Sequence, residues 1–277
     1  MTLTDPDKAP DQALRTPSNL QLRMIASIGM IAVASIALTL GGIAFWLLGV
    51  VAALFMMAEW SMLQGADAKT KRMTQFALSV PLALMAPASL ILVVHDFFTL
   101  GLLAGAAFFV VIVTRKPQLA LGVLYCGLPV FALMIIRRQH DGNEGIVFTL
   151  WALSLVWACD IGAYFTGRTL GGPKLAPVIS PNKTWSGLIG GVTLASLVAA
   201  LLHFRFGLPL RLTLATPALA VLAQGGDLYE SWLKRRAGVK DSGNILPGHG
   251  GILDRLDGLV PVAPVAAFLV LLPHFYR

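Results

Sequence analysis

The fold is decided by apolar stretches such as FFTLGLLAGAAFFVVIV, residues 97–113, in which no side chain carries a charge. A helix that crosses the hydrocarbon core of a bilayer needs about 20 mainly apolar residues, each rising about 1.5 Å. Across the whole chain 56% of the residues are hydrophobic, 13% are charged, and the mean hydropathy is +0.75. Soluble proteins carry roughly 25% charged residues. The composition therefore predicts an all-α, polytopic integral membrane protein.

Nine segments are apolar enough to be predicted as transmembrane helices. The orientation follows from the basic residues, because Lys and Arg gather in cytoplasmic loops. With the N-terminus inside, sixteen of the 21 bases are cytoplasmic, and the five others are Arg137, Arg138, Arg205, Arg211 and Arg277. This distribution predicts an N-in, C-out topology. The segments lie near residues 23–40, 43–58, 75–94, 97–113, 118–136, 146–165, 186–204, 212–226 and 258–275.

Three parts of the chain differ in composition. Residues 1–22 are a polar cytoplasmic tail without the apolar core of a signal peptide. Residues 23–136 are nearly featureless transmembrane helices, interpreted as a scaffold, and a dimer contact is left open. Residues 137–277 are the predicted catalytic domain, with cytoplasmic loops at 166–185 and 227–257. The net charge of +7 fits loop bases facing anionic lipid, and nothing resembles a soluble basic domain for nucleic acid.

Charged residues and glycines concentrate in residues 226–257, GDLYESWLKRRAGVKDSGNILPGHGGILDRLD. If the eighth helix continues beyond the membrane, Asp227, Glu230, Ser231 and Lys234 share one helical face. Magnesium is commonly held by one or two carboxylates together with substrate phosphates. Asp227, with Asp254 further along, can supply those carboxylates from two different helices.

The rest of this block suits a polyphosphate. Its glycines allow backbone N–H groups to approach a phosphate closely, and His249 is a candidate proton or hydrogen-bond donor. The alternative is an exposed loop crossed by salt bridges, which does not explain the glycine spacing. The bases that can neutralise a triphosphate are Lys234, Arg235, Arg236 and Lys240.

Two further features point in the same direction. Asp160 lies inside the sixth predicted helix, where a charge costs roughly 3 kcal/mol, so it is predicted to face a wet cavity. A buried structural Asp is the alternative. The run Ser180–Thr184 precedes the next helix, and a helix N-terminus beside Lys183 is a natural anion site. Thr184 or Ser186 is predicted to cap that helix. A basic cytoplasmic loop is the alternative for this segment.

These motifs resemble the phosphatidate cytidylyltransferase family, the CDP-diacylglycerol synthases. The family pattern, Ser-x-apolar-Lys-Arg, then Lys-Asp, then Pro-x-His-Gly-Gly-x-x-Asp-Arg-x-Asp, is matched at residues 231–235, 240–241 and 247–257. The likeness extends upstream to residues 160–184, whereas the N-terminal half matches only in hydropathy. The chain departs from the pattern at Asn182 and Ser186, where the family commonly has Lys and Glu. Activity is expected to survive, since the other acids are present.

The resemblance implies Mg²⁺-dependent transfer of CMP from CTP to phosphatidic acid, giving CDP-diacylglycerol and pyrophosphate. The site is expected on the cytoplasmic face of a bacterial-type inner membrane, among membrane lipids; a second cation and a homodimer are left open. The resemblance implies that Asp227 and Asp254 bind the metal. The predicted catalytic group is Asp227, Asp254, Lys240, Asp241 and Asp257. The predicted substrate-binding group is Asp160, Ser180, Lys183, Thr184, Lys234, Arg235, His249 and Arg255.

The chemistry agrees with this assignment. A phosphate oxygen of phosphatidic acid must attack the α-phosphorus of CTP, and both reactants are anionic, so cations have to offset their repulsion. A related lipid CTP transferase or a polyprenol kinase remains a rival. From another class, an ion-coupled transporter using Asp160, Asp227 and Asp254 as cation ligands would predict inverted repeats, which are not evident in this sequence.

Overall fold

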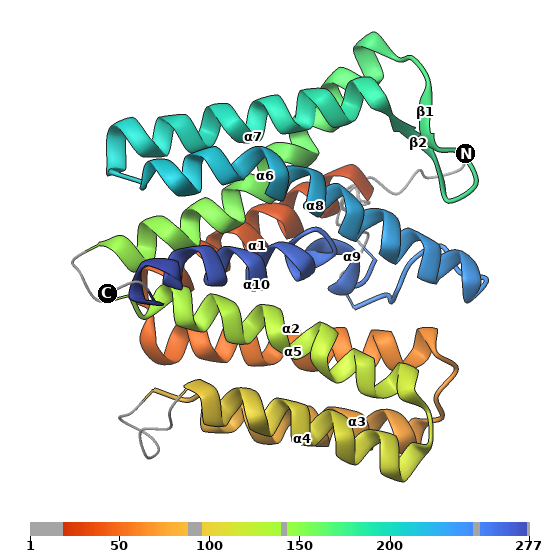
Figure 1. Cartoon of the computed structure of the whole chain (residues 1–277). Coiled ribbons are helices and arrows are strands. Elements are labelled where there is room, and N and C mark those ends of the chain that lie inside the picture. The colour runs from red at the N-terminus through yellow and green to blue at the C-terminus, as the bar shows by residue number, and fades with distance from the viewer. Residues whose placement is uncertain (1–18, 88–95, 140–142, 246–249, 276–277) are drawn as a thin grey trace, which may run out of the picture.

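The computed structural model describes residues 19–87, 96–139, 143–245 and 250–275. This part of the chain is mostly helical, and the long helices lie side by side, joined by turns at two opposite edges (Figure 1). In chain order the elements are α1 (Asn19–Leu40), α2 (Gly42–Leu63), α3 (Ala68–Leu84), α4 (Asp96–Thr114), α5 (Pro117–Arg137), α6 (Glu144–Leu170), β1 (Lys174–Ala176), β2 (Ser180–Thr184), α7 (Trp185–Phe206), α8 (Leu210–Arg236), α9 (Leu253–Leu256), α10 (Leu259–Leu271) and the 3₁₀ turn η1 (Leu272–Phe275).

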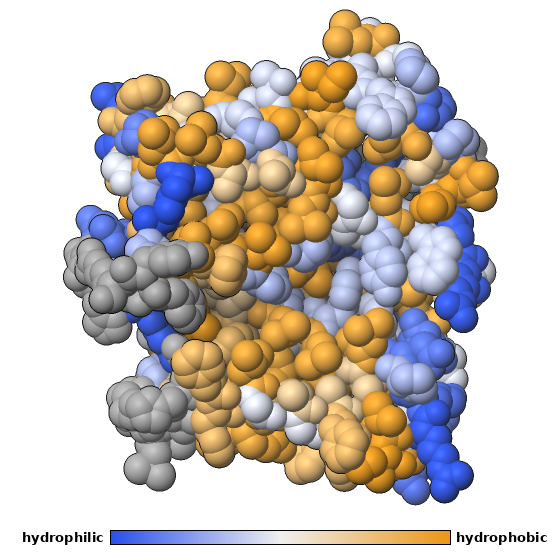
Figure 2. Space-filling view, in the orientation of Figure 1, coloured by the Kyte–Doolittle hydropathy of each residue, from blue (hydrophilic) through white to orange (hydrophobic). Residues whose placement is uncertain are grey.

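Each predicted transmembrane segment corresponds to a helix in the described chain, although the third prediction runs on into residues 88–95, which lie outside it. Within the described residues, five helices are long and apolar enough to cross a membrane: α2, α4 from Phe97 onwards, α5, α6 and α7. The described apolar part of α1, Ile31–Leu40, and α10 are shorter. A broad apolar band runs between two hydrophilic edges (Figure 2). The protein is therefore a mostly helical membrane protein, while the total of nine crossings stays a prediction.

Helices α3 and α8 explain why fewer spans qualify than were predicted. Helix α3 has 17 residues, and its first turns carry Lys69, Lys71 and Arg72. Helix α8 has 27 residues, but Arg211, Gln224 and Asp227 limit its apolar stretch, and its last turn is basic. It continues through Arg236, so residues 227–236, assigned to a loop from the sequence, are helix. Similarly, α6 extends through Leu170 before a short hairpin, in which β1 pairs antiparallel with β2.

Helices α6 and α7 approach each other closely through glycines. A Cβ atom on Gly162 would lie 2.6 Å from the carbonyl oxygen of Gly190, and one on Gly191 would lie 2.6 Å from that of Cys159. Small residues let helix backbones approach in this way in membranes, where packing is a main source of association. The contact fixes the hairpin that links the two helices.

Helix α10 joins the two hydrophobic cores of the protein. One core is built largely from α1 to α5, and the other from α5 to α8 with α10. Helix α10 packs against α5, α6 and α8. Because α9 immediately precedes α10, this position brings α9 to the edge of the helical bundle, where it contacts α2. The polar site is built around α9.

Two arginines at the opposite edge satisfy helix C-termini. Arg137 Nε donates to the carbonyl oxygen of Leu38 at 2.9 Å, and Arg138 Nη2 donates to that of Met85 at 2.6 Å. The last carbonyls of a helix lack intrahelical partners and carry partial negative charge. These bases therefore have a local structural role at the edge predicted to be extracytoplasmic.

The glycine contact between α6 and α7 predicts a stability effect. Gly162→Leu should lower the melting temperature of the detergent-purified protein, since overpacking costs roughly 1–3 kcal/mol. Gly105→Leu on α4 is the matched control, because its Cβ would meet no atom within 4 Å. Equal melting temperatures for the two variants would contradict the close packing.

Candidate active site

A cluster of charged side chains lies where the C-terminal part of α8, the short helix α9, the strand β2 and the end of α2 come together. These segments gather at the same edge of the helical bundle (Figure 1). Helix α8 contributes Asp227, Glu230 and Lys234 at the helical spacing expected from the sequence. Helix α9 contributes Asp254 and Arg255. The cluster thus combines segments that are far apart in the chain.

Asp254 is the most heavily hydrogen-bonded carboxylate of the cluster. Its Oδ2 accepts from Ser242 N at 2.9 Å, Ser242 Oγ at 2.9 Å and Gly251 N at 2.8 Å. Its Oδ1 accepts from Lys234 Nζ at 2.5 Å. Burial alone favours the neutral acid, but the Lys234 ammonium and the backbone donors outweigh it and hold the pKa of Asp254 below its usual value. Asp254 is consequently anionic and fixed in position.

Glycine is required where the loop before α9 passes this carboxylate. Gly250 has a φ of +81°, a conformation that favours glycine, and a Cβ there would lie 2.9 Å from Asp254 Oδ2. A Cβ on Gly251 would collide with Ser242 Oγ and Glu59 Oε2. The sequence suggested that these glycines expose N–H groups to phosphate. In the structure Gly251 N instead donates to Asp254.

Glu59 is a member of the cluster that the sequence analysis missed. It comes from α2, in the half of the chain interpreted as scaffold, and its side chain is fully buried. Oε1 accepts from Ile252 N at 3.0 Å, and Oε2 accepts from Leu253 N at 2.8 Å and from Ser242 Oγ at 3.0 Å. Glu59 therefore holds both the start of α9 and the serine that binds Asp254. The available signal in the sequence was that Glu59 is a single acid directly after the apolar run of residues 43–58.

Lys183 and Asp227 form a second ionic contact. Lys183 Nζ, on β2, lies 2.5 Å from Asp227 Oδ2 on α8, and both side chains are partly accessible. Ser231 Oγ donates to Asp227 Oδ1 at 3.4 Å. The hairpin thereby carries a lysine to the predicted metal ligand. The two predicted groups, substrate-binding and metal-binding, meet at this pair.

Two further carboxylates lie between these contacts. Glu230 is fully buried; its contact is the ion pair with Lys234 Nζ at 3.4 Å, and it receives no hydrogen bond from the described residues. Asp257 Oδ1 accepts from Gly258 N at 2.7 Å. Burial, and next the nearby Asp227 carboxylate, raise the pKa of Asp257 to about 7. A nearby cation would stabilise the ionised form of both acids.

Asp160 joins the cluster from α6. Gln224 Nε2, one turn before Asp227 on α8, donates to Asp160 Oδ1 at 3.1 Å. Asp160 is accessible rather than enclosed in the core, and Arg255 interacts with it electrostatically. Its amide partner agrees with the structural alternative, and the wet surrounding stays a prediction.

The remaining predicted residues are arranged differently. Thr184 caps α7, accepting from Gly187 N at 3.1 Å, as predicted, so its hydroxyl has a structural partner. Ser186, a departure from the family pattern, donates to the carbonyl oxygen of Gly171. Ser180 begins β2 opposite Ala176. His249 lies outside the described residues. Three other predicted site residues, Arg235, Lys240 and Asp241, are exposed.

Acids outnumber bases in the cluster, and an excess of carboxylate can be neutralised by protonation of buried acids or by a divalent ion. Among the described residues no three His, Cys, Asp or Glu side chains form a ready-made metal cage. Magnesium does not require one, because substrate phosphates and water complete its coordination. The acids are Glu59, Asp160, Asp227, Glu230, Asp254 and Asp257; the bases are Lys183, Lys234 and Arg255.

The contacts of Glu59 make a measurable prediction. Glu59→Gln places an amide donor among three donors, and a buried donor without a partner costs about 1–3 kcal/mol. We expect the Ile252 and Leu253 amides to exchange hydrogen roughly tenfold faster or more, measured by mass spectrometry of peptides covering residues 242–256. Glu144→Gln, exposed at the first turn of α6, is the control. Unchanged exchange would contradict the anchoring role.

Comparisons with known proteins identify the family of this chain. A model of the cytidylyltransferase family matches residues 21–272. The phosphatidate cytidylyltransferase of Brucella suis biovar 1 (strain 1330) is 40% identical over 261 residues, covering 89% of this chain and 91% of that protein. The phosphatidate cytidylyltransferase of Bacillus subtilis (strain 168) is 45% identical over 157 residues, covering 56% of this chain and 58% of that protein. The chain therefore belongs to the cytidylyltransferase family.

Proposed function

We propose that the protein transfers CMP from CTP to phosphatidic acid, giving CDP-diacylglycerol and pyrophosphate. A phosphate oxygen of the lipid forms a bond to the α-phosphorus of CTP, while the bond from that phosphorus to the bridging oxygen of pyrophosphate breaks. The proposal is supported by membership of the family and by the names of the relatives. The observation that carries it is the network of carboxylates and lysines at the edge of an apolar helical bundle.

The network provides what such a transfer needs. Little covalent chemistry by the protein is required, and the rate depends on positioning and on stabilising negative charge. Lys183 and Lys234 each lie 2.5 Å from an acid, and both are close enough to the cluster to face incoming phosphates. Rigid support by Ser242 and Glu59 limits reorganisation during the reaction.

Magnesium is the cofactor proposed for this site. Asp227 is partly accessible, and Glu230 is a buried carboxylate without a hydrogen-bond donor among the described residues. These features fit a cation held between Asp227, Asp254 and the substrate phosphates. When bound, the ion would neutralise phosphate charge and polarise the phosphoryl oxygen. Lys183 and Lys234 would add charge at the same phosphates.

The site is proposed to lie at the cytoplasmic surface of an inner membrane, with the nine helices crossing in the N-in, C-out sense. The turns that follow α2, α4, α6 and α8 share one edge of the bundle (Figure 1), and the sequence places Lys and Arg in or beside them. Cytoplasmic loops are enriched in such bases. CTP reaches this surface from the cytosol and phosphatidic acid reaches it from the bilayer. A homodimer through the N-terminal helices, left open by the sequence, is a separate hypothesis.

Activity and its dependence on Asp254 provide the direct test. Detergent-purified protein with phosphatidic acid, labelled CTP and Mg²⁺ should yield labelled CDP-lipid, and removal of Mg²⁺ with a chelator should abolish the product. Asp254→Asn removes a charge from the cluster and should reduce turnover by roughly 10²-fold or more.

Asp67→Asn is the matched control, since Asp67 caps α3 at the surface and Asn caps equally well. A panel of polyprenols and other lipids separates the rival transferase and kinase activities. Near-normal turnover by a folded Asp254→Asn variant would reject the role of this carboxylate.

Lys183 tests phosphate binding separately. Lys183→Ala should raise the KM for CTP by roughly tenfold, because a hydrogen bond to a charged group contributes about 1.5–3 kcal/mol. Lys174→Ala, an exposed lysine on β1 of the same hairpin, should have little effect. If steady-state kinetics with both substrates are the same for the two variants, the role of Lys183 is structural.

A further inference from the structure

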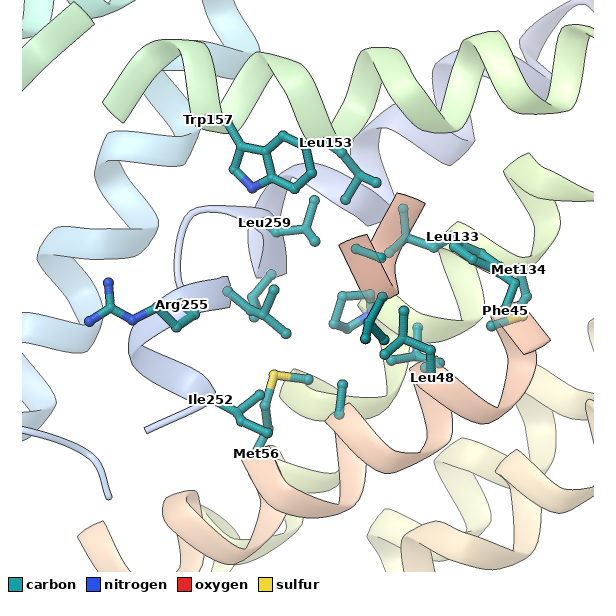
Figure 3. A pocket seen from close by; sticks show the side chains of 18 of the residues that line it. Phe45, Leu48, Met56, Leu133, Met134, Leu153, Trp157, Ile252, Arg255 and Leu259 are labelled. Atoms are coloured by element: carbon teal, nitrogen blue, oxygen red, sulfur yellow. The ribbon is translucent and has the colours of Figure 1, made fainter. Parts of the chain in front are cut away.

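An apolar cavity of about 430 Å³ lies beside the charged cluster, between α1, α2, α5, α6, α9 and α10. Its size is within the range of small-ligand pockets, about 300–1,000 Å³. Figure 3 shows aliphatic and aromatic side chains pointing into it from these helices. Representative lining residues are Val33, Leu48, Met56, Leu153 and Trp157, and among the described residues that line the cavity Arg255 is the charged one.

The cavity and the charged cluster share a structural wall. Ile252, Arg255 and Leu256 line the cavity, whereas Asp254, between them in sequence, accepts hydrogen bonds on the side of Ser242 and Lys234. The guanidinium of Arg255 projects away from the apolar side chains, at the margin of the cavity (Figure 3). The same short helix therefore separates an apolar space from the site where phosphates are expected.

The cavity also borders the membrane. Helix α1 forms part of its wall through Val33 and Ala34. The same helix exposes large apolar side chains, including those of Ile31, Ile36 and Leu40. On this side the single helix α1 thus lies between the cavity and the surface that faces lipid.

We propose that this cavity receives an acyl chain of the phosphatidic acid substrate, with Arg255 at its margin next to the phosphate of the same lipid. The inference rests on the proposed function and adds a location for the lipid. Guanidinium groups bind phosphate through paired hydrogen bonds, and the apolar walls match hydrocarbon. The cavity places apolar walls directly beside a phosphate-binding group. A site that bound CTP alone would not need such walls.

The cavity acts on position more than on affinity. Lipid tails are about as apolar as leucine side chains, so an acyl chain gains little free energy by leaving the bilayer for the cavity. Its walls instead fix where the headgroup lies, and a misplacement of about 1 Å can reduce a rate by roughly 10²-fold. Blocking the cavity should therefore disturb the reaction with long-chain lipid while leaving CTP binding intact.

Leu48 is suited to test the deep end of the cavity. It lies eight residues before Met56 on α2, about 12 Å along the helix, and Met56 lies close to Ile252 beside the cluster (Figure 3). Leu48→Trp should fill the far end. Leu47→Trp is the matched control, because Leu47 does not line the cavity and is 52% exposed.

The experiment measures CDP-lipid formation from dioleoyl and dioctanoyl phosphatidic acid in mixed micelles. Leu48→Trp should reduce kcat/KM for the dioleoyl lipid by roughly tenfold or more, affect the dioctanoyl lipid much less, and leave the KM for CTP unchanged. Leu47→Trp should match the wild type with both lipids. Equal behaviour of the two variants with both lipids would overturn the proposal.

A second measurement covers the case in which Leu48→Trp does not fold. Wild-type protein is photolabelled with phosphatidic acid that carries a diazirine near the end of one acyl chain. Labelled peptides from cavity-lining parts of α2, α5 or α6 support the proposal, whereas labelling confined to the exposed face of α4 overturns it. Absence of CDP-lipid from wild type with every chain length would instead reject the proposed function.

Discussion

The site depends on the fixed carboxylate of Asp254. It binds Lys234 of α8, Ser242 of the following loop and Gly251 next to α9, and each contact joins a different segment. An ionised carboxylate with this degree of burial is stable only when donors and an opposite charge surround it. A Cβ at Gly250 would lie 2.9 Å from Asp254 Oδ2, and one at Gly251 would collide with Ser242, which donates to the same oxygen. The geometry of the loop follows from this requirement.

Glu59 links the two halves of the chain in the same way. Its carboxylate binds the N–H groups that begin α9, and it shares Ser242 with Asp254. The N-terminal helices are therefore more than a scaffold for the C-terminal half, since one of them supplies a group that positions the cluster. The same helix, α2, lines the apolar cavity through Leu48 and Met56. A lipid substrate and a nucleotide can thus be served by adjacent surfaces of one set of helices.

The sequence predicted the helices well because length and composition determine helices in a membrane. It also predicted the shared face of Asp227, Glu230 and Lys234, on the condition that the eighth helix continues beyond the membrane, and this condition is met. It did not predict Glu59, because contacts across 183 residues or more, such as that with Ser242, leave no local pattern. It assigned phosphate binding to the backbone of Gly251, where tertiary packing directs that N–H to Asp254. The structure also has helix and a β-hairpin within the predicted loops 166–185 and 227–257. The helices extend into these loops because charged residues end a membrane span but do not end a helix.

A structure of the protein in a lipid nanodisc with Mg²⁺ and a non-hydrolysable CTP analogue tests this account most directly. We expect the triphosphate to lie between Lys183 on β2 and the α9 segment, with an ion bound at Asp227 and with Asp254 still held by Ser242 and Gly251. A nucleotide bound away from this cluster, or an ion that contacts neither Asp227 nor Asp254, would contradict it.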